Sequence, residues 1–173
     1  MKNNIILIGY MGCGKTTLGK KISYRERVAL LDTDKRIEQK QKKTINEIFD
    51  EDGESAFRQM ETECLKEFLE YSDRYIISVG GGLPMKEENR VLMKQLGTVI
   101  YLKAEPDTIY NRLKNDTTRP LLRGDNPKEK IKSMIEMRNP YYEAAADYIV
   151  CVDDKGFDTI IQEILDVAQG GNA

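Results

Sequence analysis

The chain has 173 residues, which suits one domain with a single well-buried core. Its 27 lysines and arginines against 29 aspartates and glutamates give a net charge of −2, which argues against nucleic acid as a partner. No apolar run is long enough to span a bilayer, so we expect no membrane partner. The three cysteines, Cys13, Cys64 and Cys151, form no C-x-x-C pair, and we expect a reducing, cytoplasmic location.

Residues 9–16, Gly-Tyr-Met-Gly-Cys-Gly-Lys-Thr, form the first motif and fit the phosphate-loop pattern G-x-x-x-x-G-K-[ST]. The apolar residues 5–8 before this phosphate loop are typical of a buried parallel strand, and a helical pattern follows it. Lys15 would neutralise the β- and γ-phosphates, and the Thr16 hydroxyl can bind Mg²⁺. The motif therefore predicts a nucleoside triphosphate at a helix N-terminus.

Four more short apolar runs alternate with helical patterns along the chain. Strands are expected at 28–31, 75–79, 98–102 and 148–152. Helices are expected at 35–43, from a capping box at Thr44 to a stop at Gly53, from Ser55 through Phe68, around 91–96, from Pro106, from Pro127 towards Arg138, and around 160–165. This alternation predicts an α/β fold with a five-stranded parallel sheet between two helical layers. The polar stretch 115–126 is too long for an ordinary connection, so it is either a functional lid or disordered.

Acidic residues and glycines follow two of the predicted strands. Ligands of open parallel sheets lie beyond the carboxyl ends of strands. Asp32 and Asp34 follow the second strand, and in extended chain residues two apart point the same way. One could hold Mg²⁺ through water while the other accepts a hydrogen bond from an attacking hydroxyl. Residues 80–82, all glycine, follow the third strand and would let a ligand approach the backbone closely. Since no acidic residue ends that strand, the metal role falls on Asp32.

Three arginines are candidates for binding anionic groups. Arg58 and Arg138 lie on predicted amphipathic helices, and if they converge on the site their guanidinium groups suit bidentate capture of a carboxylate. Glu61, one helical turn after Arg58, could orient it. Arg119 lies in the polar stretch and could close over the phosphates as an arginine finger supplied in cis. With no histidine in the chain, proton chemistry falls to carboxylates, lysine or water.

Taken together, these residues resemble the shikimate kinase family over nearly the whole chain. The matching motifs are residues 9–17, Asp32-Thr-Asp34, Phe57-Arg58-x-x-Glu61, residues 80–82, Arg119-Pro-Leu-Leu122 and Arg138-x-Pro140-x-Tyr142. The resemblance implies a P-loop fold like that of the nucleoside monophosphate kinases, with a lid. It also implies transfer of the γ-phosphate of ATP to the 3-hydroxyl of shikimate, a step towards chorismate and the aromatic amino acids.

The resemblance also implies a division of roles by position. Lys15, Asp34 and Arg119 would be catalytic. ATP would contact Gly12, Cys13, Gly14, Lys15, Thr16, Thr17, Arg112 and Arg119, with Arg112 against adenine. Shikimate would contact Asp34, Arg58, Gly80, Gly81, Gly82 and Arg138, and Mg²⁺ would contact Thr16 and, through water, Asp32. We expect one kinase domain, residues 1–173, acting as a monomer, with a shikimate-binding segment at about 33–61 and a lid at about 113–126.

Two positions depart from the family pattern. Lys42 stands where the family often has glycine, and a lysine in left-handed geometry costs about 1 kcal/mol, so this helix end is expected to be built differently. Ala144 stands where a glutamate is common, which leaves open how Arg138 is supported.

Other functions share parts of this pattern. A nucleoside monophosphate or gluconate kinase has the same phosphate loop, but two arginines with Asp34 favour a hydroxylated carboxylic acid. A GTPase needs Asn-Lys-x-Asp, which the sequence lacks. A nucleic-acid-driven ATPase needs a basic track and a longer chain. An ATP-binding regulator without turnover is disfavoured by intact Lys15, Asp34 and Arg119.

Overall fold

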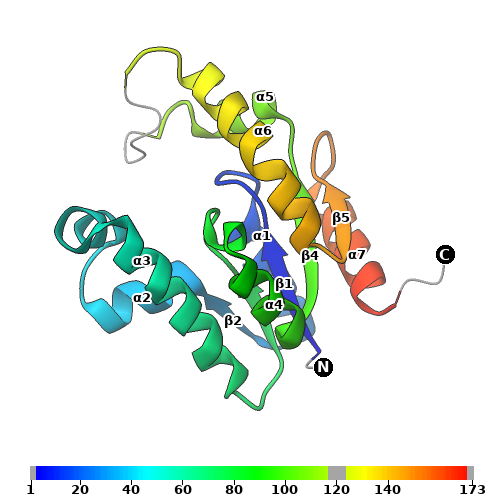
Figure 1. The fold of residues 1–173 in the computed structure, drawn as a ribbon. Coiled ribbons are helices and arrows are strands. Elements are labelled where there is room, and N and C mark those ends of the chain that lie inside the picture. The colour runs from blue at the N-terminus through cyan, green and yellow to red at the C-terminus, as the bar shows by residue number, and fades with distance from the viewer. Residues whose placement is uncertain (1–2, 117–123, 171–173) are drawn as a thin grey trace.

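A five-stranded parallel sheet forms the central layer of the molecule (Figure 1). The computed structural model describes residues 3–116 and 124–170. The strands are β1 (Asn4–Ile8), β2 (Ala29–Asp32), β3 (Tyr75–Ser78), β4 (Gly97–Lys103) and β5 (Tyr148–Cys151). Their order across the sheet is β2-β3-β1-β4-β5. The predicted parallel sheet of five strands is confirmed.

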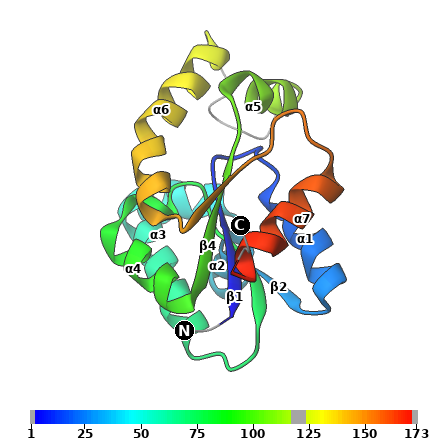
Figure 2. The same cartoon turned by 90° about the vertical axis from the view of Figure 1, so that its right-hand side faces the viewer.

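Helices cover both faces of this sheet. They are α1 (Lys15–Glu26), α2 (Thr33–Gln41), α3 (Ile45–Leu69), α4 (Glu87–Leu96), α5 (Pro106–Leu113), α6 (Pro127–Ala145) and α7 (Phe157–Ala168), with a 3-10 helix η1 (Leu83–Met85). Figure 2 shows α3, α4 and α6 on one side of the strands and α1 and α7 on the other. The predicted three-layer α/β/α fold is therefore confirmed. Within the described residues, no helix is both long and apolar enough to cross a membrane.

The core lies along the central strands. β1 is buried over its whole length, and β3 and β4 are buried over most of theirs. These strands are rich in isoleucine, which suits a pleated surface covered on both faces. Each fully buried aliphatic side chain contributes about 1.5–3 kcal/mol relative to an exposed one. The sheet is thus a rigid platform for the loops at its ends.

The strand register brings three loops together at one edge of the sheet. Ser78, the last residue of β3, pairs with Asp32 at the end of β2 and with Leu7 near the end of β1. Because the strands are parallel, the chain leaves all three at nearly the same level. The phosphate loop, the start of α2 and the glycine loop (residues 80–82) therefore lie side by side.

Of three predicted helix boundaries, two are confirmed and one is wrong. The capping box at Thr44 is present, with reciprocal hydrogen bonds to Glu47. Gly53, the predicted stop, has φ 85° and ψ 168° and breaks α3 at a kink, as expected. The expectation for Lys42 is wrong, because it does take the left-handed conformation, with φ 53° and ψ 38°, and it ends α2 in the way a glycine would.

Helix α6 is longer than the sequence pattern indicated. It continues past Arg138 and through Pro140 to Ala145. A proline inside a helix removes one backbone hydrogen bond and bends the axis. Tyr142 and Ala145 are both fully buried, and this packing holds the last turns of α6 against the sheet despite the proline.

Helices α2 and α3 are joined by a cluster around Glu67. Arg36 Nη2 lies 2.6 Å and Lys40 Nζ 2.8 Å from its carboxylate oxygens, and the Tyr71 hydroxyl donates at 2.6 Å. Burial alone would raise the pKa of Glu67, but the three donors outweigh it and lower that pKa to about 2. The cluster fixes α2, whose first turn carries Asp34.

We expect Glu67→Gln to lower the free energy of unfolding by about 1–2 kcal/mol at neutral pH, because charge-assisted hydrogen bonds are replaced by weaker ones. A carboxylate with a depressed pKa stabilises the fold above its ordinary pKa of 4.5 and loses that contribution as the pH falls towards about 2. The difference between variant and wild type should therefore shrink in acid. Urea unfolding at neutral pH and at about pH 3 measures it.

The matched control is Glu63→Gln on the same helix, where the side chain is 54% exposed and its Lys66 partner lies 3.6 Å away. An exposed pair of this kind contributes about 0–1 kcal/mol at most. Equal losses in the two variants would contradict a special role for the Glu67 cluster.

Candidate active site

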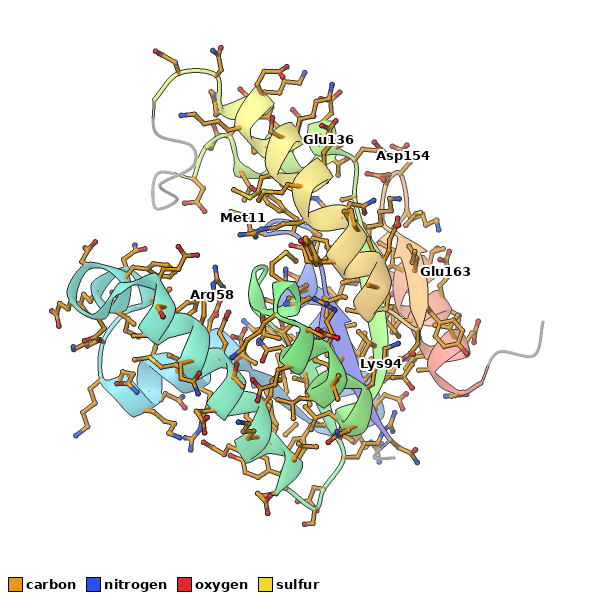
Figure 3. The ribbon with its side chains drawn as sticks, viewed as in Figure 1. Met11, Arg58, Lys94, Glu136, Asp154 and Glu163 are labelled. Carbon is orange, nitrogen blue, oxygen red and sulfur yellow. The ribbon has the colours of Figure 1, made fainter. Side chains whose placement is uncertain are left out.

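A single open cavity of about 1260 Å³ occupies the edge of the sheet where the three loops meet. In Figure 3, Met11 of the phosphate loop and Arg58 of α3 both lie on the open side of the molecule below α6. Predicted site residues that line the cavity are Gly12, Gly14, Lys15, Thr16, Thr17, Asp32, Asp34, Arg58, Gly80, Gly81, Gly82, Arg112 and Arg138. Cys13 is buried and does not line it, and its backbone N–H donates to the carbonyl of Tyr10 at 3.2 Å. Arg119 and the rest of residues 117–123 in the predicted lid lie outside the described residues.

The phosphate loop forms one end of the cavity. Gly12 and Gly14 have φ values of 81° and 104°, which side chains rarely adopt, and this curls the loop ahead of α1. The Lys15 ammonium donates to the carbonyls of Gly9 at 2.6 Å and Tyr10 at 3.1 Å. These two hydrogen bonds hold the Lys15 side chain against the start of the phosphate loop, close to the N-terminus of α1. Backbone N–H groups and the helix dipole make this end a site for phosphate.

An arginine and an aromatic ring border the outer part of this end. Arg112 on α5 donates from Nη1 to the carbonyl of Gly12 at 3.1 Å. Phe157, the first residue of α7, lines the same cavity with 44% of its surface exposed, and Lys21 Nζ lies 5.2 Å from its ring centroid. Sequence reasoning missed Phe157. The available signal was an aromatic residue opening a helix just after the fifth strand, at the edge of the sheet where ligands bind.

Asp32 and Asp34 both reach the cavity, but not for the expected reason. The chain is extended at Asp32 and already helical at Asp34, which lies in the first turn of α2, so the extended spacing assumed from the sequence is wrong. Asp32 caps this helix by accepting from the Lys35 N–H at 3.1 Å. Between them, the buried Thr33 accepts from the Gly80 N–H at 3.0 Å and ties α2 to the glycine loop.

The residues present fit a magnesium ion. No group of three or more acidic, cysteine or histidine side chains gathers around one point in the described part of the chain. Mg²⁺ does not need one, since it usually takes one or two carboxylates with phosphate oxygens and water. Thr16 and Asp32 line the same cavity, and Asp32 uses only Oδ1 for its cap within the described residues. Their oxygen atoms are of the hard type that Mg²⁺ prefers, so the assignment of Thr16 and Asp32 to the metal stays a prediction.

Arg58 and Glu61 form a buried ion pair at the opposite end of the cavity. Arg58 Nη1 lies 2.9 Å from Glu61 Oε2, and the Glu61 side chain is only 1% exposed. This confirms the predicted contact across one helical turn. Glu61 Oε1 is buried without a hydrogen-bond partner among the described residues. Burial raises the pKa of Glu61 to about 7 although Arg58 opposes the rise.

The glycine loop lies directly against these charged groups. A Cβ on Gly80 would lie 2.8 Å from Asp34 Oδ1, and one on Gly81 would lie 3.2 Å from Arg138 Nη1. A Cβ on Gly82 would lie 2.7 Å from Arg58 Cζ. The structure therefore brings both arginines and the carboxylate of Asp34 to one short stretch of bare backbone. Cation and carboxylate side chains arranged in this way can hold a small acid and one of its hydroxyl groups.

Asp34 has the electrostatics of a proton acceptor. Its Oδ1 is buried and has no hydrogen-bond partner among the described residues. Burial and the neighbouring charge of Asp32 raise the pKa of Asp34 to about 6, and Lys15 limits the rise. A carboxylate poised near neutral pH can take a proton from a reacting hydroxyl more readily than an ordinary aspartate.

The match to a family of known proteins agrees with this geometry. The family model described as shikimate kinase matches residues 11–169. A shikimate kinase of Dictyoglomus turgidum is 40% identical over 169 residues, which are 96% of this chain and 97% of the relative. One of Bacillus cereus (strain AH187) is 45% identical over 149 residues, which are 84% and 87% of the two chains.

The chain belongs to the shikimate kinase family. It is an enzyme that phosphorylates shikimate on the 3-hydroxyl with ATP and Mg²⁺. A shikimate kinase of Acinetobacter baumannii, solved in complex with shikimate, superposes with a TM-score of 0.89 at 34% identity, covering 98% of this chain and 94% of that one. A gluconokinase of Sinorhizobium meliloti 1021 has a TM-score of 0.64 at 15% identity, covering 96% and 91%, which shows likeness of fold alone.

We expect kcat/KM for shikimate to fall as the pH falls through about 6, because only ionised Asp34 can accept a proton and its pKa is raised to that value. Rates of ADP formation at saturating ATP, measured across the pH range, show this fall as the acid limb of the pH profile. Asp34→Asn should be much slower and should lack the limb. An acid limb near the ordinary aspartate pKa of 3.8 would contradict the raised pKa.

Proposed function

We propose that the cavity binds ATP at the phosphate loop and shikimate at the glycine loop. The phosphoryl group then passes from the nucleotide, beside Lys15, to the shikimate hydroxyl, beside Asp34. The observation that carries this proposal is the convergence of Asp34, Arg58 and Arg138 on residues 80–82 within the cavity that Lys15 also lines. Two guanidinium groups can bind the carboxylate of shikimate. A carboxylate with a raised pKa, as at Asp34, can accept the proton of a reacting hydroxyl.

The nucleotide is held by backbone and by three side chains. Backbone N–H groups of residues 12–17 and the dipole of α1 bind the phosphates. The Lys15 ammonium leaves the carbonyls of Gly9 and Tyr10 and moves onto the β- and γ-phosphates. The adenine ring lies between Arg112 and Phe157, which offer a guanidinium plane and an exposed ring at the same end of the cavity.

Thr16, and Asp32 through water, would hold Mg²⁺, which would neutralise charge on the phosphate oxygens. Asp34 orients the 3-hydroxyl and takes its proton as the oxygen attacks in line. Arg58 and Arg138 fix the shikimate carboxylate and so set the distance between hydroxyl and phosphate. Positioning and electrostatics supply most of the acceleration in such a reaction.

The remaining assignments concern the parts of the chain around this centre. Residues 1–173 form one kinase domain, in which residues 33–61 bind shikimate and residues 113–126 form a lid. Arg119, outside the described residues, closes on the phosphates as a catalytic arginine, and lid closure excludes water that would otherwise accept the phosphoryl group. The enzyme acts as a cytoplasmic monomer without nucleic acid or membrane partners, which its near-neutral charge and three free cysteines support.

Arg58→Ala and Arg138→Ala should each weaken shikimate binding by about 1.5–3 kcal/mol, or roughly one to two decades, because each loses a charged hydrogen-bonding partner. Affinity for a non-hydrolysable ATP analogue should stay nearly unchanged. Calorimetric titration of both ligands into both variants measures this. Loss of ATP affinity with retained shikimate affinity would show that the acceptor end is misplaced.

Substrate choice can be measured with the wild-type enzyme. ADP formation with shikimate is compared with that with gluconate, with nucleoside monophosphates and with water alone. We expect rapid turnover with shikimate only, and slow hydrolysis with water because the open cavity lacks an oriented acceptor. Turnover of gluconate at a comparable rate would contradict the assignment of the two arginines to the shikimate carboxylate.

A further inference from the structure

Tyr142 is a buried polar side chain beside the acceptor end of the cavity that the reaction described above does not use. It lies on α6, one turn after Arg138, and is fully buried. Its hydroxyl donates to the carbonyl of Gly81 at 2.6 Å, which is at the short end of the usual range for O–H···O hydrogen bonds. The Arg138 guanidinium group opposes the rise that burial causes in the pKa of this phenol, so the two side chains lie close to each other.

Arg138 itself is held close to this contact. A Cβ on Gly81 would lie 3.2 Å from Arg138 Nη1, so the guanidinium group lies against the same glycine whose carbonyl binds Tyr142. The Arg138 Cζ also lies 5.8 Å from the centroid of the buried Tyr10 ring. The phenol of Tyr142 thus connects two parts of the acceptor end, the arginine on α6 and the backbone of the glycine loop.

The ring of Tyr142 has little room to move. It packs against Tyr101 on β4, with ring centroids 5.0 Å apart and planes at 38°. Tyr101 is also buried, and its own hydroxyl donates to Asn139 Oδ1 at 3.0 Å. A ring fixed by burial and by a packed aromatic neighbour places its oxygen at one point relative to the sheet.

We propose that Tyr142 is a positioning residue for shikimate, which accepts an N–H from Arg138, donates its O–H to Gly81, and so fixes the guanidinium group to receive the carboxylate. This inference rests on the proposed role of Arg138. Burial raises the pKa of Tyr142, so the phenol stays protonated and keeps donating at neutral pH. The family often has a glutamate at position 144 that could support Arg138, but this chain has an exposed alanine there. The contact with Tyr142 supplies support for Arg138 in its place.

The matched test removes one hydroxyl at a time from the two packed tyrosines. Tyr142→Phe keeps the ring and loses the hydrogen bond to Gly81 together with the proposed one from Arg138. Tyr101→Phe also loses a buried hydroxyl with one hydrogen bond, but it has no hydrogen bond to Arg138 or the glycine loop among those of the described residues. Both variants should lose stability to a similar degree. Only Tyr142→Phe should weaken shikimate binding, by about ten-fold, with little change in the affinity for an ATP analogue.

Three measurements make up the experiment. Thermal unfolding compares the two variants with wild type, and titrations are run well below the melting temperature of the less stable one. Calorimetric titration gives the affinity for shikimate and for shikimate methyl ester. Steady-state rates give KM and kcat, and we expect Tyr142→Phe to raise KM for shikimate more than it lowers kcat. Because the ester lacks the charged carboxylate, Tyr142→Phe should bind it about as well as wild type does.

Arg138→Ala, alone and combined with Tyr142→Phe, separates this inference from the function on which it rests. If Arg138→Ala weakens shikimate binding, adding Tyr142→Phe should change affinity further by less than about two-fold, because the group it positions is gone. Equal shikimate affinities for Tyr142→Phe and Tyr101→Phe, with Arg138→Ala still impaired, would overturn the role of Tyr142 alone. Unchanged affinity in Arg138→Ala would overturn the assignment of Arg138 and this inference with it.

Discussion

The absence of side chains at residues 80–82 is the constraint on which the rest of the site depends. Three charged side chains from three different helices approach this stretch closely. A methyl group added to any one of the three glycines would contact one of these side chains. The built distances are 2.8 Å to Asp34 Oδ1, 3.2 Å to Arg138 Nη1 and 2.7 Å to Arg58 Cζ. The loop is fixed in turn by hydrogen bonds with Thr33 and Tyr142. Bare backbone at this point lets α2, α3 and α6 bring their charges to one place.

That convergence places two carboxylates in the same buried region, and their surroundings give them different properties. Glu61 is bound to Arg58 through one oxygen, and its burial raises its pKa to about 7. Asp34 has no such partner within the described part of the chain and lines the cavity, and Lys15 limits the rise of its pKa to about 6. Glu61 therefore holds Arg58 in place, while Asp34 is left available to bind a reacting hydroxyl. Environment rather than residue type separates the two roles.

The sequence predicted most of the fold and of the site because the decisive signals were local. The phosphate loop is contiguous, and alternating apolar runs and helical patterns are enough for a parallel sheet. Asp32 and Asp34 were predicted correctly as cavity residues from a wrong local geometry. Phe157 opens a helix just after the fifth strand, and Tyr142 lies in the motif that begins at Arg138, but the sequence alone did not show their roles. Those roles arise from tertiary contacts with other elements. Arg119 lies outside the described residues, and its role stays a prediction.

The most direct test of this account is calorimetric titration of shikimate and of an ATP analogue into Gly82→Ala. The new methyl group would occupy the space of the Arg58 guanidinium, so shikimate affinity should fall about ten-fold or more while ATP affinity and folding are kept. Gly156→Ala is the control, because a Cβ there would meet no atom within 4 Å. Wild-type affinity for shikimate in Gly82→Ala would contradict the claim that the glycine loop sets the positions of the charged residues.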